Sequence, residues 1–475
     1  MDKLIKITTF IKDIIKDTIY EGRVFTVGGS VRDFVMGNKI KDIDIVVDIA
    51  NGGIDFAHFC MNKGLLMREP VIFERYGVAA FRFKSFPDED IECVMTRGEK
   101  YPDRNSRNPE TVFASIEDDC IRRDLTINAL YYNISTGEIV DMVGGLKDIE
   151  NKVIRTTNEN PDIVFDDDAL RILRCIKFSV RYGWEIEPKT YESMKRYVDR
   201  LEIISKERIK DEFNKILLSD NASMGIRTLC DIGAMKYIIP EVDEMIGMEQ
   251  NDFHFGDVFE HTMALLDYDT KHFESEDIAV RLALLLHDIG KIVTKNVGDD
   301  GRVHFYDHEF AGATMVVDIL KRLKYDNKTI DTVQFLVKNH MRTKNFGNYC
   351  SKIKMKSFNK LAYDCKNMYL YMSLARVIDC DNNSHKAEHN ITGQYDYFVN
   401  HMDDAVKMFD YKLPVDGNDV MGVLNIPGGV LVKNVLERLL KRAFPNPDIL
   451  TKDSCLKQIP SIAKEIVKSD PNLFY

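Results

Sequence analysis

The sequence lacks the features that mark secreted, membrane-spanning and zinc-ribbon proteins. Its nine cysteines are scattered and form no CxxC pair, which argues against a zinc ribbon or a disulfide framework and suits a reducing compartment. No apolar run reaches membrane-spanning length, and charges interrupt the N-terminal segment where a signal peptide would need an apolar core. We therefore expect a cytoplasmic protein with no membrane contact.

Proline and glycine are also scarce. The chain has 13 prolines and 27 glycines in 475 residues, a balance that favours helices. At ~100–200 residues per domain, this length predicts several domains. The net charge of −11 argues against a simple polyanion binder, although carboxylates clustered at metal sites would contribute to it and a local basic groove is still allowed.

The first part of the chain alternates between helical and strand patterns. Residues 3–20 are amphipathic with helical spacing, and Val24–Val27 are typical of a short buried strand that ends at Gly28 and Gly29, with Ser30 placed to cap a helix. From about residue 166 the spacing is helical, so the predicted class is α+β, with a small mixed-sheet head and helical domains after it. Further strands are predicted at residues 43–49, 78–83, 90–95, 125–132 and 138–142.

Carboxylates gather on the strand that follows the glycine turn. Asp42 and Asp44 alternate along it, so both side chains point to one face. A third carboxylate is expected from a neighbouring strand, and the strand-like residues on either side of Glu92 make it the candidate. Such a set can hold a divalent cation that bridges a triphosphate, while Gly28 and Gly29 let backbone N–H groups approach a phosphate. Each feature alone is common on protein surfaces. Their order and spacing together favour metal-assisted attack of a 3′-hydroxyl on an α-phosphate.

These motifs resemble those of class II CCA-adding enzymes, which are tRNA nucleotidyltransferases, and of their bacterial poly(A) polymerase relatives. The resemblance rests on residues 28–33, 41–44 and 122–130, and it continues with gaps over most of the chain. It implies catalytic carboxylates at Asp42, Asp44 and Glu92, with Mg²⁺ at the first two. The motifs and the resemblance together predict that nucleotide is bound by Gly28, Gly29, Ser30, Arg32, Asp33, Arg122, Arg123, Asp124, Asn128, Asp167, Asp168, Arg171 and Arg174.

A pair of charged residues is expected to select the nucleotide. On a helix, Asp168, Arg171 and Arg174 are neighbours. An Asp only accepts and an Arg only donates hydrogen bonds, so Asp168 and Arg171 side by side match the donor and acceptor edge that cytosine and adenine share. An ordinary surface ion pair is the alternative. The resemblance to the EDxxR motif of CCA enzymes favours selection, although Ala169 stands where the family usually has Pro.

The segment from Arg97 to Pro109 is similar to the flexible loop that helps full CCA enzymes change from C to A addition. CC-adding relatives have this loop shortened. Its presence favours addition of all three nucleotides.

Histidines gather in the second half of the chain in the order typical of HD metal-dependent phosphohydrolases. The pattern is His261, then His287 and Asp288, then Asp381, with His308 and His340 spaced as ligands of a second metal. Imidazole and carboxylate together suit a divalent transition metal (Ni, Mn or Co) whose bound water is the nucleophile. In similar bacterial CCA enzymes such a domain is associated with phosphatase and 2′,3′-cyclic phosphodiesterase activity.

The last segment resembles the RNA-binding tail of the same family. Its cations would contact phosphates of the tRNA acceptor and TΨC arms, although a solvated helix face is the alternative for any one of them. The expected partners are tRNA, CTP and ATP, and a homodimer is one alternative for the oligomeric state. The predicted RNA-binding residues are Lys433, Arg438, Lys441 and Arg442.

The organisation expected from these motifs has four parts. They are a nucleotidyltransferase head at 1–144, a nucleotide-selecting and RNA-binding neck and body at 145–250, an HD domain at 251–390 and a tRNA-binding tail at 391–475. Two other functions compete with CCA addition. One is poly(A) polymerase, which typically lacks an HD domain. The other is a phosphohydrolase whose front half only binds RNA and has no catalytic role. Such a front half would not need all six of the intact nucleotidyltransferase residues, which are Asp42, Asp44, Arg123, Asp124, Asp168 and Arg171.

Overall fold

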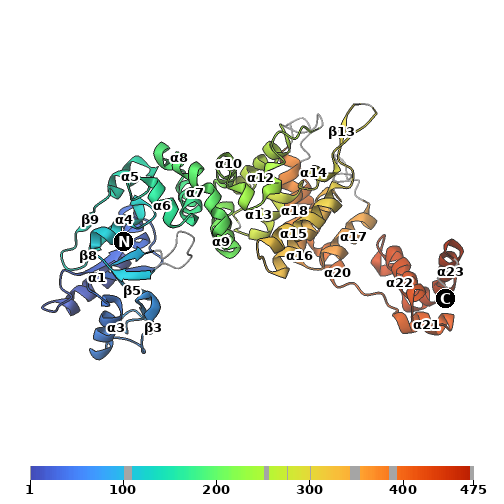
Figure 1. The fold of residues 1–475 in the computed structure, drawn as a ribbon. Helices are drawn as coiled ribbons and strands as arrows, with labels where there is room; N and C mark the ends of the chain where they lie inside the picture. Colours follow the sequence, from blue (N-terminus) through green and yellow to red (C-terminus); the bar gives the residue numbers. More distant parts are fainter. Residues whose placement is uncertain are drawn as a thin grey trace. The chain divides into compact units, whose positions relative to one another are not determined.

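The computed structural model describes residues 2–100, 110–250, 256–274, 276–299, 301–342, 354–384 and 393–470. Contacts divide the chain into two compact units (Figure 1). The first holds residues 1–243 with 322–324, and the second holds residues 244–321 with 325–475. The four predicted domains stay a prediction. None of the described helices is long and apolar enough to cross a membrane.

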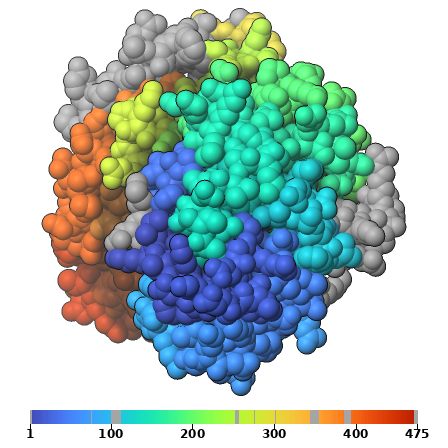
Figure 2. All heavy atoms as spheres, turned by 90° about the vertical axis from the view of Figure 1, so that its left-hand side faces the viewer, coloured from blue at the N-terminus to red at the C-terminus, as the bar shows by residue number. Residues whose placement is uncertain are grey.

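A seven-stranded mixed sheet organises the start of the first unit, whose surface faces the viewer in Figure 2 in blue to green. The strand order is β3-β4-β5-β2-β1-β8-β9, and β2 runs parallel to β5 while the other pairs are antiparallel. Its strands are β1 (Val24–Val27), β2 (Ile43–Val47), β3 (Val71–Phe73), β4 (Val78–Phe81), β5 (Ile91–Met95), β8 (Leu130–Asn133) and β9 (Ile139–Asp141).

The two faces of this sheet belong to different cores. On β2, Ile43, Ile45 and Val47 join the cluster formed with α1 (Asp2–Ile15) and α3 (Gly52–Asn62), whereas Val46 joins a separate cluster with residues of β1 and β8. Because strand side chains alternate, Asp44 lies on the Val46 face, away from the larger core. The site therefore shares its face of the sheet with the smaller of the two cores.

Helices complete the first unit, with short strand pairs between them. A hairpin of β6 (Arg97–Lys100) and β7 (Glu110–Phe113) flanks residues 101–109, so the central part of the predicted 97–109 loop lies outside the described residues. The remaining elements are α2 (Gly29–Val35), α4 (Ile116–Ile121), α5 (Gly145–Asn151), β10 (Val153–Ile154), α6 (Pro161–Asp167), α7 (Leu170–Tyr182), β11 (Glu185–Ile186), α8 (Pro188–Tyr197), α9 (Lys206–Leu217), α10 (Ala222–Asp231) and α11 (Pro240–Asp243).

The described residues of the second unit are helical apart from one short hairpin and the turns between elements. A separate apolar cluster of α21, α22 and α23 forms its C-terminal part. Its elements are α12 (Val258–His272), α13 (Ile278–Leu286), α14 (Lys291–Thr294), β12 (Asn296–Val297), β13 (Val303–His304), α15 (His308–Arg322), α16 (Asn327–Asn339), α17 (Met355–Cys365), α18 (Met368–Asn383), α19 (Gln394–Asn400), α20 (Met402–Phe409), α21 (Gly417–Leu424), α22 (Val430–Ala443) and α23 (Lys452–Ser469).

Three sequence-based predictions of local structure are wrong. The first helix ends at Ile15, and the chain turns at Asp17, which has a φ of +56°. Helix α2 is capped by Gly28 rather than Ser30, whose hydroxyl donates to the Val27 carbonyl. Residues 126–128 form a 3₁₀ turn instead of continuing a strand.

A close approach of two glycines joins the end of α13 to the start of α15. A Cβ on Gly290 would lie 2.0 Å from the carbonyl oxygen of His308 and 2.5 Å from the backbone nitrogen of Gly312. Gly290 has ordinary helical backbone angles, so space rather than conformation requires glycine here. This contact positions His308 against the segment that carries His287 and Asp288.

Substituting Gly290→Ala is expected to destabilise the second unit by about 3 kcal/mol, because the added methyl group meets backbone atoms that cannot rotate away. Urea unfolding followed by circular dichroism measures the change. The control is Gly422→Ala in α21, where no atom lies within 4 Å of the added Cβ and stability should rise by about 0.5–1 kcal/mol. Equal behaviour of the two variants would contradict the packing argument.

Candidate nucleotide site and candidate metal centre

The parallel pairing of β2 and β5 brings two predicted carboxylates together. In the strand register Asp44 is the direct partner of Glu92, and Asp42, just before β2, is near enough for its charge to raise the pKa of Asp44. The placement predicted for Glu92, on a neighbouring strand, is confirmed. The three carboxylates can serve a divalent cation from one face of the sheet.

The proximity of these carboxylates changes the acidity of Asp44. Burial and, next, the negative charge of Glu92 raise its pKa to about 6, although Arg123 opposes the shift. A carboxyl that resists ionisation next to another carboxylate is a site that a cation would relieve. This is the electrostatic signature of a metal-binding position.

The glycine turn at Gly28 and Gly29 lies beside the guanidinium of Arg123. Gly28 has a φ of +73°, a conformation that other residues rarely adopt, and α2 begins directly after it. A Cβ at Gly28 would lie 3.7 Å from Nη1 of Arg123, so a guanidinium lies beside this turn. An anion approaching Gly28 and Gly29 would meet backbone N–H groups and the charge of Arg123 together.

A chain of buried polar side chains links α2 to α7. Arg32 donates from Nη1 to Oδ1 of Asn128 at 2.6 Å, and Asn128 donates from Nδ2 to Asp124 at 3.1 Å. Arg174 on α7 donates from Nε to the other oxygen of Asp124 at 2.6 Å. Burial alone would raise the pKa of Asp124, but Arg174 and the hydrogen bonds lower it to about 2. The ionised Asp124 thus ties the helix of the selecting residues to the glycine turn.

Asp119 holds the two arginines of the 122–124 motif. It is fully buried and accepts hydrogen bonds from Arg122, Arg123 and the hydroxyl of Tyr131. Burial would raise its pKa, yet Arg123 and Arg122 lower it to about 2. Sequence reasoning missed Asp119, although its spacing of three and four residues before the arginines on a helix was the available signal.

The selecting residues do not lie on one continuous helix as predicted. Helix α6 ends at Asp167, and Asp168 has extended backbone angles before α7 begins at Leu170. One oxygen of Asp168 accepts from the Leu170 N–H, and the other pairs with Arg208 of α9 at 2.7 Å. Arg171 on α7 lies 3.9 Å from Asp167. Arg208, which the sequence motifs do not single out, is therefore an added member of this site.

Six predicted metal ligands from five helical segments converge in the second unit. All are buried, and the two oxygens of Asp288 face different groups. Oδ2 lies 3.2 Å from Nε2 of His287 and 3.9 Å from Nε2 of His261, which is itself 3.1 Å from Asp381. Oδ1 lies 3.2 Å from Nε2 of His308 and 3.8 Å from Nε2 of His340. Asp288 is thus shared by two potential ligand groups.

The imidazole orientations fit metal ligation. Nδ1 of His287, His308 and His340 faces a backbone carbonyl, at 2.9, 2.9 and 2.7 Å. That hydrogen bond places the proton on Nδ1 and leaves a lone pair on Nε2. All three Nε2 atoms are buried without a hydrogen-bond partner among the described residues. His308 and His340 thus direct buried lone pairs at Asp288. Burial lowers the pKa of His287 but Asp288 and Asp381 together raise it more, so a metal at Nε2 of His287 would replace a proton. The three nitrogens are a candidate donor set for a divalent metal.

A buried lysine joins this cluster. Nζ of Lys291 lies 2.6 Å from Oδ2 of Asp288 and donates to Gln250. Burial would raise the pKa of Asp288, but His287 and Lys291 keep it well below its ordinary value. Burial and His287 lower the pKa of His340 to about 3, which keeps this imidazole neutral, as a ligand must be. Sequence reasoning missed Lys291.

The predicted RNA-binding cations lie on one helix of the C-terminal part. All four are exposed on α22, whose buried side faces α21 and α23. Arg442 is also held by Gln458 at 2.8 Å. The cations are Lys433, Arg438, Lys441 and Arg442.

Comparisons with known families agree with this division of sites. Residues 24–155 match the model of the poly A polymerase head domain, and residues 183–246 match the probable RNA- and SrmB-binding site of polymerase A. Residues 254–368 match the HD domain. The carboxylates Asp42, Asp44 and Glu92 thus fall in the first match and five of the six metal-ligand candidates in the third, while Asp168, Arg171 and Arg174 lie between the matches and Asp381 lies beyond the last one.

Full-length relatives extend the match. The chain is 32% identical over 338 residues to the multifunctional CCA protein of Acinetobacter baumannii (strain AYE), which covers 67% of this chain and 74% of the relative. It is 31% identical over 323 residues to the A-adding tRNA nucleotidyltransferase of Deinococcus radiodurans, with 66% and 68% covered.

Solved structures share the fold. The CCA-adding enzyme of Bacillus stearothermophilus in complex with CTP aligns with a TM-score of 0.70 at 19% identity, over 99% of this chain and 100% of that one. The CCA-adding enzyme of Thermotoga maritima complexed with tRNA aligns with a TM-score of 0.57 at 21% identity, over 97% and 94%.

Removing the charge of Glu92 is expected to make Asp44 more acidic. In the metal-free Glu92→Gln variant the pKa of Asp44 should fall below about 6 and stay above its ordinary 3.8, because burial is the larger cause of the shift. Carbon-detected NMR titration measures it. Glu74→Gln, at an exposed position outside the site, is the control. An unchanged Asp44 would show that the two carboxylates do not interact.

The same pKa sets a pH dependence. A carboxyl with a raised pKa must lose a proton before it binds a cation, so the affinity for Mg²⁺ should fall by about tenfold per pH unit below pH 6. The effect of pH on the free energy of unfolding has the opposite sign to that of a salt-bridged carboxylate, whose pKa is lowered by folding. The metal-free fold loses stability as pH rises from about 4 to 6, since the folded protein holds this proton more tightly than the unfolded chain does.

Proposed function

The chain belongs to the family of multifunctional CCA proteins and tRNA nucleotidyltransferases, and we propose that it adds C, C and A to the 3′ end of tRNA from CTP and ATP without a nucleic-acid template. The observation that carries the proposal is the pairing of Asp44 with Glu92 beside the turn at Gly28. This pairing supports the proposal because Arg123, which lies beside Gly28, also acts on the charge of Asp44, so the proposed metal ligands and the proposed phosphate-binding groups are neighbours.

The residues divide the work of nucleotide transfer. Asp42 and Asp44 would hold Mg²⁺, which when bound neutralises the triphosphate and lowers the pKa of the attacking hydroxyl. The turn at Gly28 and Gly29, with Arg123 beside it, orients the triphosphate. The RNA 3′-oxygen then forms a bond to the α-phosphorus, the bond from that phosphorus to the bridging oxygen breaks, and pyrophosphate leaves.

Selection of C and A is assigned to Asp168 and Arg171. Asp168 presents an acceptor and Arg171 presents donors, which match the shared edge of cytosine and adenine and oppose that of guanine and uracil. Arg208 fixes one oxygen of Asp168 through its 2.7 Å ion pair and leaves the direction of the carboxylate defined. Arg174 connects this region to Asp124 and hence to the glycine turn.

Docking of tRNA is assigned to the cations of α22. Phosphates of the acceptor and TΨC arms would meet an exposed basic face without any reading of base sequence. Action on tRNA also agrees with the expected cytoplasmic location. A homodimer stays an alternative for the oligomeric state.

A second activity is favoured by the buried cluster around Asp288. We propose that it hydrolyses a terminal phosphate or a 2′,3′-cyclic phosphate at an RNA end, which would prepare a damaged end for new addition. A divalent transition metal (Ni, Mn or Co) held by the cluster would supply an activated water. The oxygen of that water bonds to phosphorus, and the bond from phosphorus to one ribose oxygen breaks. His261, His287, Asp288, Asp381, His308 and His340 are the proposed ligands.

The two activities should be separable by substitution. Asp44→Asn should lower nucleotide addition by roughly a thousandfold or more, because it removes a metal ligand, and His287→Ala should leave addition unchanged. The assay combines Mg²⁺, labelled CTP or ATP and tRNA that ends at the discriminator base. Asp55→Asn, an exposed carboxylate on α3, is the control.

The products of this assay distinguish the competing functions. Addition of C, C and A supports the proposal, and a long A tail identifies a poly(A) polymerase. Addition of A alone, and only to tRNA that already ends in CC, identifies an A-adding enzyme like the named Deinococcus relative. A wild-type protein that adds nothing while it hydrolyses phosphate contradicts the proposal.

The number of metals tests the shared role of Asp288. After loading with Ni²⁺, Mn²⁺ or Co²⁺ and removal of excess metal, elemental analysis should find two ions per chain in the second unit. His340→Ala should retain one ion, and Asp288→Asn should lose both. His272→Ala, at an exposed position on α12, should change nothing. A single ion in the saturated wild type would refute the two-metal arrangement.

A further inference from the structure

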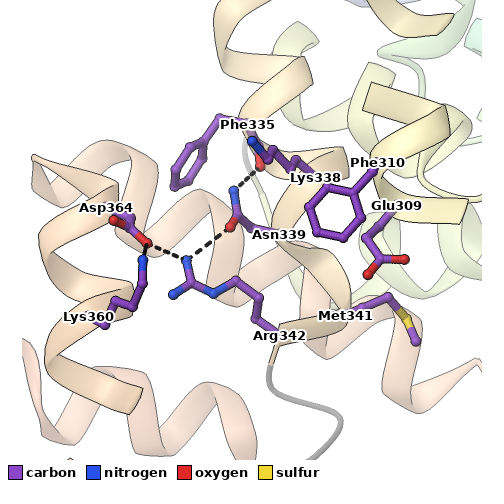
Figure 3. Close-up of a pocket in the computed structure, with 9 residues that line it drawn as sticks. All are labelled: Glu309, Phe310, Phe335, Lys338, Asn339, Met341, Arg342, Lys360 and Asp364. Carbon is purple, nitrogen blue, oxygen red and sulfur yellow. Dashed lines mark hydrogen bonds and ion pairs between the residues drawn. The ribbon is translucent and has the colours of Figure 1, made fainter. Parts of the chain in front are cut away.

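A cavity of about 720 Å³ opens beside the metal centre in the second unit (Figure 3). Its walls come from the start of α15, the end of α16 and one face of α17. The volume is within the range of roughly 300–1,000 Å³ that is usual for small-molecule sites. Its lining residues are Glu309, Phe310, Phe335, Lys338, Asn339, Met341, Arg342, Lys360 and Asp364.

The cavity carries an excess of positive charge that is held in place. Arg342 donates from Nη1 to Asn339 at 3.0 Å and to Asp364 at 2.8 Å, and Lys360 lies 2.7 Å from the same Asp364 oxygen. Lys338 is the third cation, against the carboxylates of Glu309 and Asp364. A net positive lining fits an anion such as a phosphate.

Aromatic rings complete the lining. Phe310 is 50% exposed, and Nζ of Lys338 lies 5.9 Å from its ring centroid. Phe335 lies on the same helix as Lys338, one turn earlier. An exposed ring next to a cation offers a stacking surface for a base beside a partner for its phosphate.

The cavity lies next to two proposed metal ligands. Glu309 and Phe310 directly follow His308, and Asn339 and Met341 flank His340. Consecutive Cα atoms are about 3.8 Å apart, so the walls begin within one or two residues of both imidazoles. The carboxylate of Glu309 itself lies 3.7 Å from Nδ1 of His308. The cavity is therefore a neighbour of the metal centre along the chain, while none of the six proposed ligands is among its lining residues.

We propose that this cavity binds the phosphorylated terminal nucleotide of a substrate of the second unit. Phe310 and Phe335 contact the base and ribose, while Lys338, Arg342 and Lys360 neutralise the phosphate. Asp364 orients two of these cations and limits the net charge, so a single nucleotide fits better than a long run of backbone. The shared chemistry is a phosphorylated nucleotide, from an RNA 3′ end or from a free mononucleotide.

This inference rests on the proposed hydrolase function, but binding tests it independently of turnover. The probe is a fluorescein-labelled trinucleotide that ends in cytidine 3′-phosphate, with full-length protein in EDTA and fluorescence anisotropy as the readout. Lys338→Gln and Phe310→Leu should each weaken binding by about fivefold or more. Lys321→Gln, an exposed lysine on α15 outside the cavity, is the matched control and should bind like wild type.

Two comparisons identify the ligand. The same trinucleotide with a 3′-hydroxyl should bind more weakly and should respond less to Lys338→Gln. Displacement of the probe by cytidine 3′-monophosphate at similar concentration identifies free nucleotides as the source. Displacement only by RNA identifies RNA ends. If both cavity variants bind the phosphate-ended probe as tightly as wild type, the inference is overturned.

Turnover by the metal-loaded enzyme separates the two proposals. If the cavity holds substrate, Lys338→Gln raises KM for 2′,3′-cyclic phosphate hydrolysis much more than it lowers kcat. Hydrolysis that survives His287→Ala contradicts the hydrolase function and leaves the binding result standing. Hydrolysis that His287→Ala abolishes, with an unchanged KM in Lys338→Gln, contradicts the cavity alone.

Discussion

The parallel pairing of β2 on β5 is the constraint on which the nucleotide site depends. It places two carboxylates, Asp44 and Glu92, in register on one face of a sheet, where burial and repulsion raise the pKa of Asp44. Like charges held this close oppose folding, and the sheet tolerates them because Arg123 offsets part of the repulsion and the larger core lies on the other face. The glycine turn, Arg123 and the Asp124 network all surround this one electrostatically strained point.

The sequence predicted which residues form the candidate sites more accurately than it predicted the backbone conformation around them. The strand at residues 24–27 and the proximity of Glu92 to Asp44 could be predicted, because alternation and order along the chain determine them. The helix break at Asp168 could not be predicted, since propensity alone does not reveal that its side chain accepts from the Leu170 N–H and reaches Arg208. The 3₁₀ turn at residues 126–128 escaped for a similar reason. It packs where a Cβ on Gly145 would lie 2.3 Å from the Thr126 carbonyl, which is a purely tertiary contact.

For the candidate metal centre, the sequence predicted which residues are ligand candidates but not how their side chains are arranged. All six ligand candidates were found from residue type and order, because histidines and acids in an apolar helical setting are a strong signal. What the sequence could not show is the sharing of Asp288 between two groups, or the backbone carbonyls that turn each Nε2 inward. These are properties of side-chain direction, which depends on how helix ends meet.

The contact between Gly290 and Gly312 has a consequence for how this region can vary. His308 is positioned by its backbone lying directly against Gly290, while the chain between them passes through α14 and the β12–β13 hairpin. The ligand geometry is therefore set by a short-range contact rather than by the length of the connecting segment. Insertions or deletions at the tip of the β12–β13 hairpin should be tolerated, so this tip can accept an affinity tag or a fluorescent reporter without disturbing the metal ligands.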